Sequence, residues 1–574
     1  MQAISQTTLD APPREASAKE LAITIGVMAA AALLFGLLFN RESTLSYSIG
    51  YNLYGAERIL DGEVPYRDFH TLYPPATLYL NALLFKWFGT GLYPALAGVM
   101  IFKVLTVGAI YIAAREVMGR TWALAAAVFS LIWLRPNGPF KAVPMHYGAL
   151  FLALGLYLLL RYVRESRAGY LVGAGVMFGL LALFKHNIGA YALAGALAMV
   201  FAEKRLRGAA KAEDATGAES VMKRAASLLL GTALPLAPVA VYMQLQGALA
   251  PMLKTLLFGP GEFLLSRLAA TPRPWFPLLI AVSLSGWCYA ALRLRHRHQL
   301  AVALWVTAFA ASAYAVNNTD QSVVDTMIFY APAMVIIAGL ALSIFKTDWW
   351  SGDRMILLAV TIAAAAAFME AFPRFAREQA IAAMPFVAAL LLYLLHGFRP
   401  ALMAQVADQR QAKLAIMLLP FTLYLMGARL FFNTYFGDEL VLKSNHELAI
   451  ERGRGVYFPE ARGKEIEEVV GFIQSRVPEG GYFFAQSYAG SSFLFLADRN
   501  NPSGAQFWGG VGVSDQERAE TLAALEQRGV QLIVTGDRDL AAEKYQPMRD
   551  LIETQFNLRH DFGEVVILER ASQR

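Results

Sequence analysis

YSIGYNLYGAERILDGEVPYRDFHTLYPPATLYLNALLFKWFG, residues 47–89, separates two long apolar runs and is itself both aromatic and acidic. Residues 52–61 have the periodicity of an amphipathic helix. Gly62 is placed to end it, because glycine readily adopts the left-handed backbone found after helix C-termini. The pair Pro74-Pro75 interrupts the chain again, and residues 76–88 then read as a helix whose aromatic side chains suit a membrane interface. This stretch therefore predicts two short helices at a membrane surface.

The chain around this stretch has the composition of a polytopic membrane protein. Of its 574 residues, 56% are hydrophobic and 16% are charged, whereas soluble domains average about 45–50% and 25%. These values exclude a disordered chain, a disulfide-rich secreted domain and an ordinary soluble enzyme. The net charge of +6 is assigned to cytoplasmic loops, where Lys and Arg accumulate, rather than to nucleic-acid binding. The single cysteine, Cys288, lies in an apolar run and cannot form an internal disulfide.

Apolar runs predict thirteen transmembrane helices. When the N-terminus is placed in the cytoplasm, the basic loops between the runs fall on the inner side, which is the positive-inside pattern. The same rule places the short turn Lys185-His186-Asn187 at the outer surface and makes residues 41–90 the first outer loop. The runs are 21–39, 91–114, 121–134, 147–163, 170–184, 188–202, 226–245, 276–292, 300–316, 328–345, 355–371, 380–397 and 414–432.

The chain is predicted to have three parts. Residues 1–20 form a cytoplasmic tail, residues 21–432 the transmembrane domain, and residues 433–574 an extracytoplasmic domain. In the last part charge rises and no run is long enough to span a membrane. Helical stretches such as 465–476 alternate there with strand-like stretches such as 565–569, which is typical of an α/β domain. We therefore expect an all-α polytopic membrane domain, followed by a small α/β domain outside the membrane.

Two stretches of this sequence resemble the GT-C glycosyltransferases, in particular the bacterial mannosyltransferase-like and RgtA/B/C/D-like branch. They are AERILDGEVPYRDF (56–69), followed by Tyr73-Pro74-Pro75, and FLFLADRNNP (493–502). The resemblance implies a GT-C fold and an inverting transfer of a hexosyl or pentosyl group from a polyprenyl-phosphate-sugar donor. The implied acceptor is a glycan, a lipid or a protein at the outer face of the membrane. Membrane lipids are expected partners, and nucleic acid is not.

The segment after the first span departs from the pattern of these enzymes. They usually carry an acidic residue there, whereas the matching residues 47–51 read YSIGY. Either a later acid replaces this base, or the chain has altered or lost activity. A transporter or lipid flippase, and a catalytically inactive glycan-binding scaffold, remain the alternative functions.

Transfer from such a donor needs a carboxylate that accepts the proton of the acceptor hydroxyl. We predict Asp68 for this role, because it lies in the irregular segment between two proline breaks, and Glu57 as the second choice. A solvated surface role is the alternative for each of them. Asp61 precedes the helix-ending Gly62 and has Arg58 nearby, so it is assigned a structural role.

Cations and polar groups of the outer turns are the predicted ligands of the donor. A cation in a short turn between two spans is expensive unless it has a partner, although snorkelling to lipid headgroups is the alternative. The sequence shows no metal-binding, nucleotide-sugar or phosphate-loop motif, so no cofactor and no metal ligand is assigned, while a divalent metal ion stays compatible with the reading. The predicted ligands are Arg67, Lys185, His186, Lys141, Arg135, His70 and Tyr66.

Overall fold

The computed structural model describes most of the chain. The predicted spans at 276–292, 300–316 and 414–432 lie outside the described residues except for single positions, and Arg135, Lys141 and Cys288 lie outside them too. The described residues are 18–42, 45, 47–134, 144–207, 218–267, 307, 321–345, 350–371, 377–405, 429, 443–486, 488–504, 515–536, 540 and 545–571.

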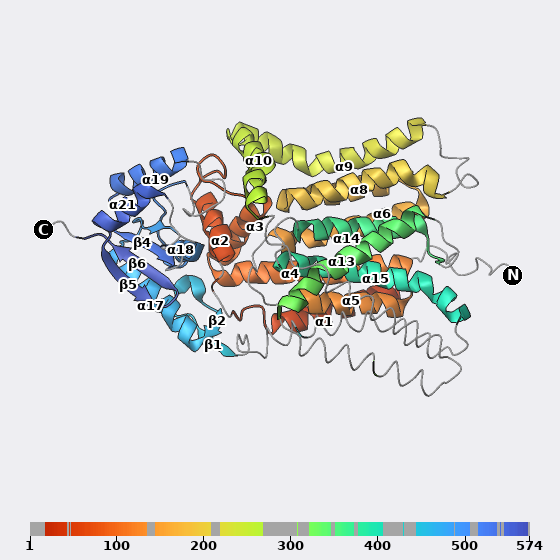
Figure 1. The fold of residues 1–574 in the computed structure, drawn as a ribbon, viewed down its shortest axis with the longest axis horizontal. Helices are drawn as coiled ribbons and strands as arrows, with labels where there is room; N and C mark the ends of the chain where they lie inside the picture. Colours follow the sequence, from red (N-terminus) through yellow and green to blue (C-terminus); the bar gives the residue numbers. More distant parts are fainter. Residues whose placement is uncertain are drawn as a thin grey trace.

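Long apolar helices run side by side and form a bundle, with a smaller α/β unit at one end of it (Figure 1). Within the described residues, six helices are long and apolar enough to cross a membrane, and helices satisfy their own backbone hydrogen bonds there. The chain is a multi-pass membrane protein. The bundle helices are α1 (Ala18–Gly36), α4 (Leu92–Val117), α5 (Arg120–Leu134), α6 (Pro144–Glu165), α7 (Ala168–Phe184), α8 (His186–Arg207), α9 (Ala218–Leu245), α13 (Gln321–Ile344), α14 (Arg354–Phe368) and α15 (Arg377–Gln405).

One helix at the α/β end of the bundle is not anticipated by the apolar runs. It is α10 (Leu249–Arg267), which follows α9 directly. Lys254 and Pro260 divide its apolar residues into short pieces, so no piece approaches the roughly 20 residues of a span. This helix matters because it packs beside the first outer loop.

The first loop contains the two predicted helices. α3 (Ala76–Phe88) has the predicted bounds, and α2 (Tyr47–Leu60) starts earlier than predicted. Gly62 follows α2 with a φ of +91°, the left-handed conformation that glycine adopts without strain. Between the helices, Pro65 and Phe69 form an isolated β-bridge that closes a tight turn.

The C-terminal part is a small α/β unit, as predicted. It contains a β1–β2 antiparallel pair and a four-stranded sheet of order β3-β4-β6-β5, in which only β3 and β4 are parallel. The one parallel pair, β3 and β4, needs a crossover connection, and this connection contains helices α18 and α19. Its elements are β1 (Ser444–Glu447), β2 (Tyr457–Pro459), α17 (Glu460–Arg476), β3 (Phe484–Ala485), α18 (Tyr488–Leu496), α19 (Asp515–Gln527), β4 (Leu532–Gly536), α21 (Gln546–Gln555), β5 (Leu558–Phe562) and β6 (Val565–Glu569).

The α/β unit and the first loop share one hydrophobic core. Leu53 of α2 and Phe85 of α3 belong to the same buried cluster as Phe495 of α18, and the rings of Phe85 and Phe495 stack with centroids 5.7 Å apart. Gly50 lets α2 approach α18 closely, because a Cβ atom there would overlap the backbone of Ser492. The C-terminal unit therefore fixes the position of the first loop.

Candidate functional site

The segment between α2 and α3 is folded around Asp68. The carboxylate accepts a hydrogen bond from the backbone N–H of Val64 at 2.7 Å and two more from the Arg67 guanidinium, Nε at 2.9 Å and Nη2 at 2.8 Å. These bonds from Arg67, with a smaller contribution from the Val64 N–H, lower the pKa of Asp68. Its side chain is 31% exposed. Asp68 is therefore an ionised carboxylate, held in one orientation and still accessible.

The same segment is anchored on the α9–α10 connection. Tyr66 adopts a φ of +69° and packs, buried, against Met243 and Met252. Its hydroxyl donates to the carbonyl of Tyr73, and burial keeps the pKa of Tyr66 well above its usual value, so the hydroxyl remains a donor. Arg67 reaches the carbonyl of Gln246 at 3.2 Å. Two of the predicted ligands thus build the turn that carries Asp68.

Lys185 lies against the end of this segment. Its Nζ sits 4.7 Å from the centre of the Tyr73 ring, an attractive cation–π contact. The same Nζ pairs with Oε1 of Glu370 at 2.8 Å, and Asn187 Nδ2 donates to the other oxygen of Glu370 at 2.9 Å. Glu370 lies in a short 3-10 helix, Met369–Ala371, between α14 and α15. The chain therefore brings the predicted cation of the α7–α8 turn to the first loop.

The two predicted histidines contact different parts of the structure. His186 begins α8 and hydrogen-bonds to the backbone of Leu256 in α10. His70 follows the Asp68 turn, and its backbone N–H donates to the carbonyl of Gly504 at 2.9 Å. Burial lowers the pKa of His70, which favours the neutral form of its imidazole.

Glu57, the second predicted base, contacts the C-terminal unit. Its carboxylate forms a bidentate ion pair with Arg452, which also pairs with Asp498 and donates to the carbonyl of Phe495 at 2.7 Å. Burial raises the pKa of Glu57, and Arg452 opposes that rise. Both oxygens are engaged in each of the two carboxylates, and the difference between them is exposure, 31% for Asp68 against 14% for Glu57.

Asp61 and its neighbour Arg58 lie at the end of α2. Arg58 pairs with Glu63, Nε to Oε2 at 2.6 Å, and stacks over the ring of Phe69 at 4.7 Å. Arg58 therefore stiffens the Asp68 turn from its other side, and the partner we considered for it, Asp61, is not its ion-pair partner in the described structure.

Three charged residues of this region were not predicted from the sequence. Arg452 is distant in sequence from the first loop, which it contacts through Glu57, and Glu370 is distant from the Lys185 turn that it contacts. Glu42 is the third, a buried acid between α1 and α2, and its backbone N–H donates to the carbonyl of Tyr457 at 2.8 Å. An acid does therefore follow the first span, although it lies before residues 47–51. The signal that points to Glu370 is its place at the outer end of an apolar run, where a charge needs a partner.

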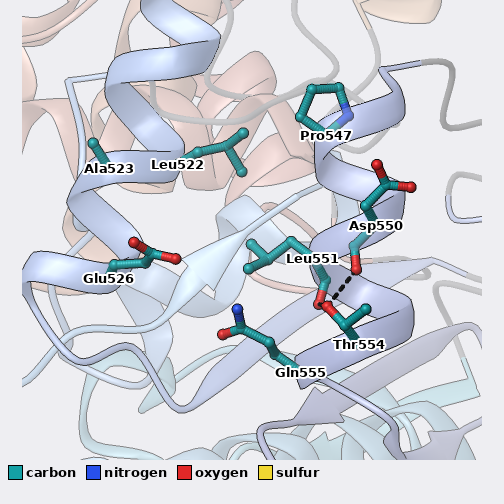
Figure 2. Close-up of a pocket in the computed structure, with 8 residues that line it drawn as sticks. All are labelled: Leu522, Ala523, Glu526, Pro547, Asp550, Leu551, Thr554 and Gln555. Atoms are coloured by element: carbon teal, nitrogen blue, oxygen red, sulfur yellow. Dashed lines mark hydrogen bonds between the residues drawn. The ribbon is translucent and has the colours of Figure 1, made fainter.

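A cavity of about 290 Å³ opens in the C-terminal unit between α19 and α21 (Figure 2). Its charged lining residues are Glu526 and Asp550, and the side chains of Leu522 and Leu551 form its apolar part. Two carboxylates repel a phosphate, so this cavity does not suit the charged part of the expected donor. Within the described residues, no group of three His, Cys, Asp or Glu side chains is placed to hold a metal ion.

Comparisons with known protein families find a similarity over part of the chain. Residues 73–212 match the family described as dolichyl-phosphate-mannose-protein mannosyltransferase. No curated protein sequence matches the chain.

Solved structures are similar over almost the whole chain. ArnT from Cupriavidus metallidurans, bound to undecaprenyl phosphate, aligns with a TM-score of 0.53 at 12% identity, over 97% of this chain and 99% of that one. The apo oligosaccharyltransferase of Archaeoglobus fulgidus aligns with a TM-score of 0.48 at 16% identity, over 91% of this chain and 70% of that one. The likeness to ArnT shows that this chain shares the fold of that protein, and residues 73–212 are similar to the mannosyltransferase family.

Proposed function

We propose that this chain is a glycosyltransferase that moves a sugar from a polyprenyl-phosphate-linked donor to a hydroxyl of a glycan, lipid or protein. The observation that carries the proposal is the contact between Lys185 and Tyr73. It joins a cation at the end of the bundle to the loop segment that holds the ionised carboxylate of Asp68. The undecaprenyl phosphate bound by ArnT and the match to a family named for a dolichyl-phosphate sugar support a lipid-linked phosphate as the leaving group.

The proposed reaction is a single displacement with inversion. The acceptor oxygen bonds to the anomeric carbon on the face opposite the phosphate, and its proton passes to Asp68. The bond between the anomeric carbon and the phosphate oxygen breaks, and its electron pair stays on the lipid phosphate. Lys185 stabilises the negative charge that develops there, because a fixed cation costs no reorganisation during the reaction. Arg67 keeps the carboxylate of Asp68 ionised and oriented, and Tyr66 holds in place the turn that carries it.

Lys185→Gln should weaken binding of undecaprenyl phosphate by about tenfold to a hundredfold, because hydrogen bonds to charged groups contribute about 1.5–3 kcal/mol. The measurement is binding of undecaprenyl phosphate to the purified full chain in detergent. Lys86→Gln is the matched control, since Lys86 is an exposed lysine on α3 of the first loop. Equal affinity in both variants would show that Lys185 does not bind the phosphate.

The orientation in the membrane is part of the same proposal. We place the α/β end of the bundle outside a bacterial inner membrane, with the N-terminus in the cytoplasm. Arg115 lies in the last turn of α4, the end of that helix that is far from the first loop, and pairs with Glu20, while Arg224 pairs with Glu203 near the end of α8. Arginine-rich helix ends are typical of the cytoplasmic side.

Reporter fusions after Gly208 and after Ala571 should therefore report opposite sides of the membrane. Gly208 follows the last residue of α8, and Ala571 follows the last strand of the α/β unit. A phosphatase active only outside the cytoplasm should be active at Ala571 and inactive at Gly208. The reverse result would turn the proposed site toward the cytoplasm.

A further inference from the structure

Glu370 is a buried acid in contact with the proposed phosphate site. Its side chain is 5% exposed and that of Lys185 is 13% exposed. Both carboxylate oxygens are engaged, one by Lys185 Nζ at 2.8 Å and the other by Asn187 Nδ2 at 2.9 Å. A lysine that is this buried would destabilise the folded chain without an opposite charge beside it. The carboxylate of Glu370 therefore stabilises the buried ammonium group of Lys185 when no ligand is bound.

The balance of charge around Lys185 changes when a phosphate binds. A phosphate and the Glu370 carboxylate would then share the single cation of Lys185, leaving two anions close together where little water screens them. Like charges in such surroundings repel by several kcal/mol. The phosphate and Glu370 are therefore alternative partners of Lys185 rather than simultaneous ones.

The turn that carries Lys185 also offers unused hydrogen-bonding groups. Within the described residues, Nδ1 of His186 and Oδ1 of Asn187 are buried and have no hydrogen-bond partner. Such groups are rare in folded proteins and point to a polar ligand. Because Asn187 holds the second oxygen of Glu370, the carboxylate keeps one partner while Lys185 turns to a phosphate.

We propose that Glu370 is the resident counter-ion of Lys185, and that the phosphate of the lipid carrier displaces it on binding. The inference rests on the proposed function and adds a positioning residue to it. Glu370 holds Lys185 in place in the empty site, weakens binding of the carrier, and speeds its release after transfer, because the carboxylate returns to Lys185 as the phosphate leaves.

Glu370→Gln tests this directly, since it keeps the shape of the side chain and removes the charge. Undecaprenyl phosphate should bind the purified variant about tenfold more tightly than the unmodified chain, a change of about 1.4 kcal/mol, and should dissociate more slowly. Glu370→Asp keeps the charge and should stay within about threefold of the unmodified chain. A purely structural role predicts the opposite sign, because loss of the pair would disorder Lys185 and weaken binding.

Two further variants make the result decisive. Glu203→Gln removes another buried carboxylate, paired with Arg224 at the far end of the bundle, and should leave binding unchanged. Asn187→Leu removes the partner that Glu370 keeps when Lys185 turns to a phosphate, so it should weaken binding by about threefold. Unchanged or weaker binding in Glu370→Gln, or tighter binding in Asn187→Leu, would overturn the inference.

The same measurements separate this inference from the proposed function. Binding that depends on Lys185 in the unmodified chain, without a gain in Glu370→Gln, would remove only the role of Glu370. Absence of undecaprenyl phosphate binding in the unmodified chain and in every variant would remove the proposed donor together with the inference.

Discussion

Asp68→Asn should lower the rate of sugar transfer by about 10²–10⁴, the usual contribution of a positioned general base. Asparagine has nearly the same volume, and its amide oxygen can still accept the hydrogen bond from the N–H of Val64. The turn should therefore survive while the proton acceptor is lost. Binding of undecaprenyl phosphate should stay within about threefold, because the phosphate is assigned to Lys185.

The measurement is transfer by the purified full chain from a panel of synthetic polyprenyl-phosphate sugars. Glu57→Gln should cause a smaller fall, through its contact with Arg452, and Asp61→Asn should change little. Near-normal turnover in Asp68→Asn with a collapse in Glu57→Gln would reverse the assignment of the base. Lack of turnover in the unmodified chain across the whole panel would favour an inactive glycan-binding scaffold.

The pH dependence follows from the contacts of Asp68. Hydrogen bonds from Arg67 lower its pKa, so the carboxylate remains ionised at pH values below the usual aspartate pKa of about 3.9. Protonation of Asp68 should therefore not reduce the rate between neutral pH and about pH 4. The low pKa also makes it a modest base, which places the expected effect of Asp68→Asn nearer the lower end of the range.

Local sequence patterns were sufficient to predict the bounds of those helices and strands whose ends are set by nearby residues. The bounds of α3 and β6 agree with the prediction, because apolar spacing, proline breaks and runs of β-branched residues act within a few positions. α10 was missed because Lys254 and Pro260 break its apolar pattern, and tertiary contacts with the first loop outweigh that local signal.

The candidate site was only partly predictable for the same reason. Lys185 was singled out because a cation in a short turn between two spans needs a partner. That partner, Glu370, comes from another helix pair far along the chain. Glu57 was the second choice of base, and its partner Arg452 lies 395 residues away. One sequence carries no signal for such pairs, since each side chain alone resembles a solvated charge.

Arg452→Met should lower the free energy of unfolding by about 3 kcal/mol at neutral pH, because it leaves Glu57 buried without its cation. The side chains of Arg452 and Glu57 are 12% and 14% exposed, which makes this pair more valuable than a surface pair. Arg476→Met is the control, since Arg476 is 47% exposed in its pair with Glu569, and such pairs contribute about 0–1 kcal/mol.

The pH dependence of this loss has a definite sign. Burial already holds the pKa of Glu57 above its usual value, and removal of Arg452 should raise it further. A carboxyl with a higher pKa in the folded state binds more protons when folded, so the folded state is favoured at low pH and loses stability as pH rises through that pKa. The deficit of Arg452→Met relative to the unmodified chain should therefore shrink between pH 7.5 and pH 5.

Glu57→Gln added to Arg452→Met should recover much of the lost stability at neutral pH, because the buried charge is then absent. Thermal unfolding of the purified chain in detergent gives the stability, and hydrogen exchange of α2 shows whether the loss lies at its contact with α18. A deficit that is independent of pH and is not relieved by Glu57→Gln would assign the loss to the packing of the arginine stem on Phe495, where its guanidinium lies 5.1 Å from the ring centre. In that case the first loop would be held by the shared apolar core alone.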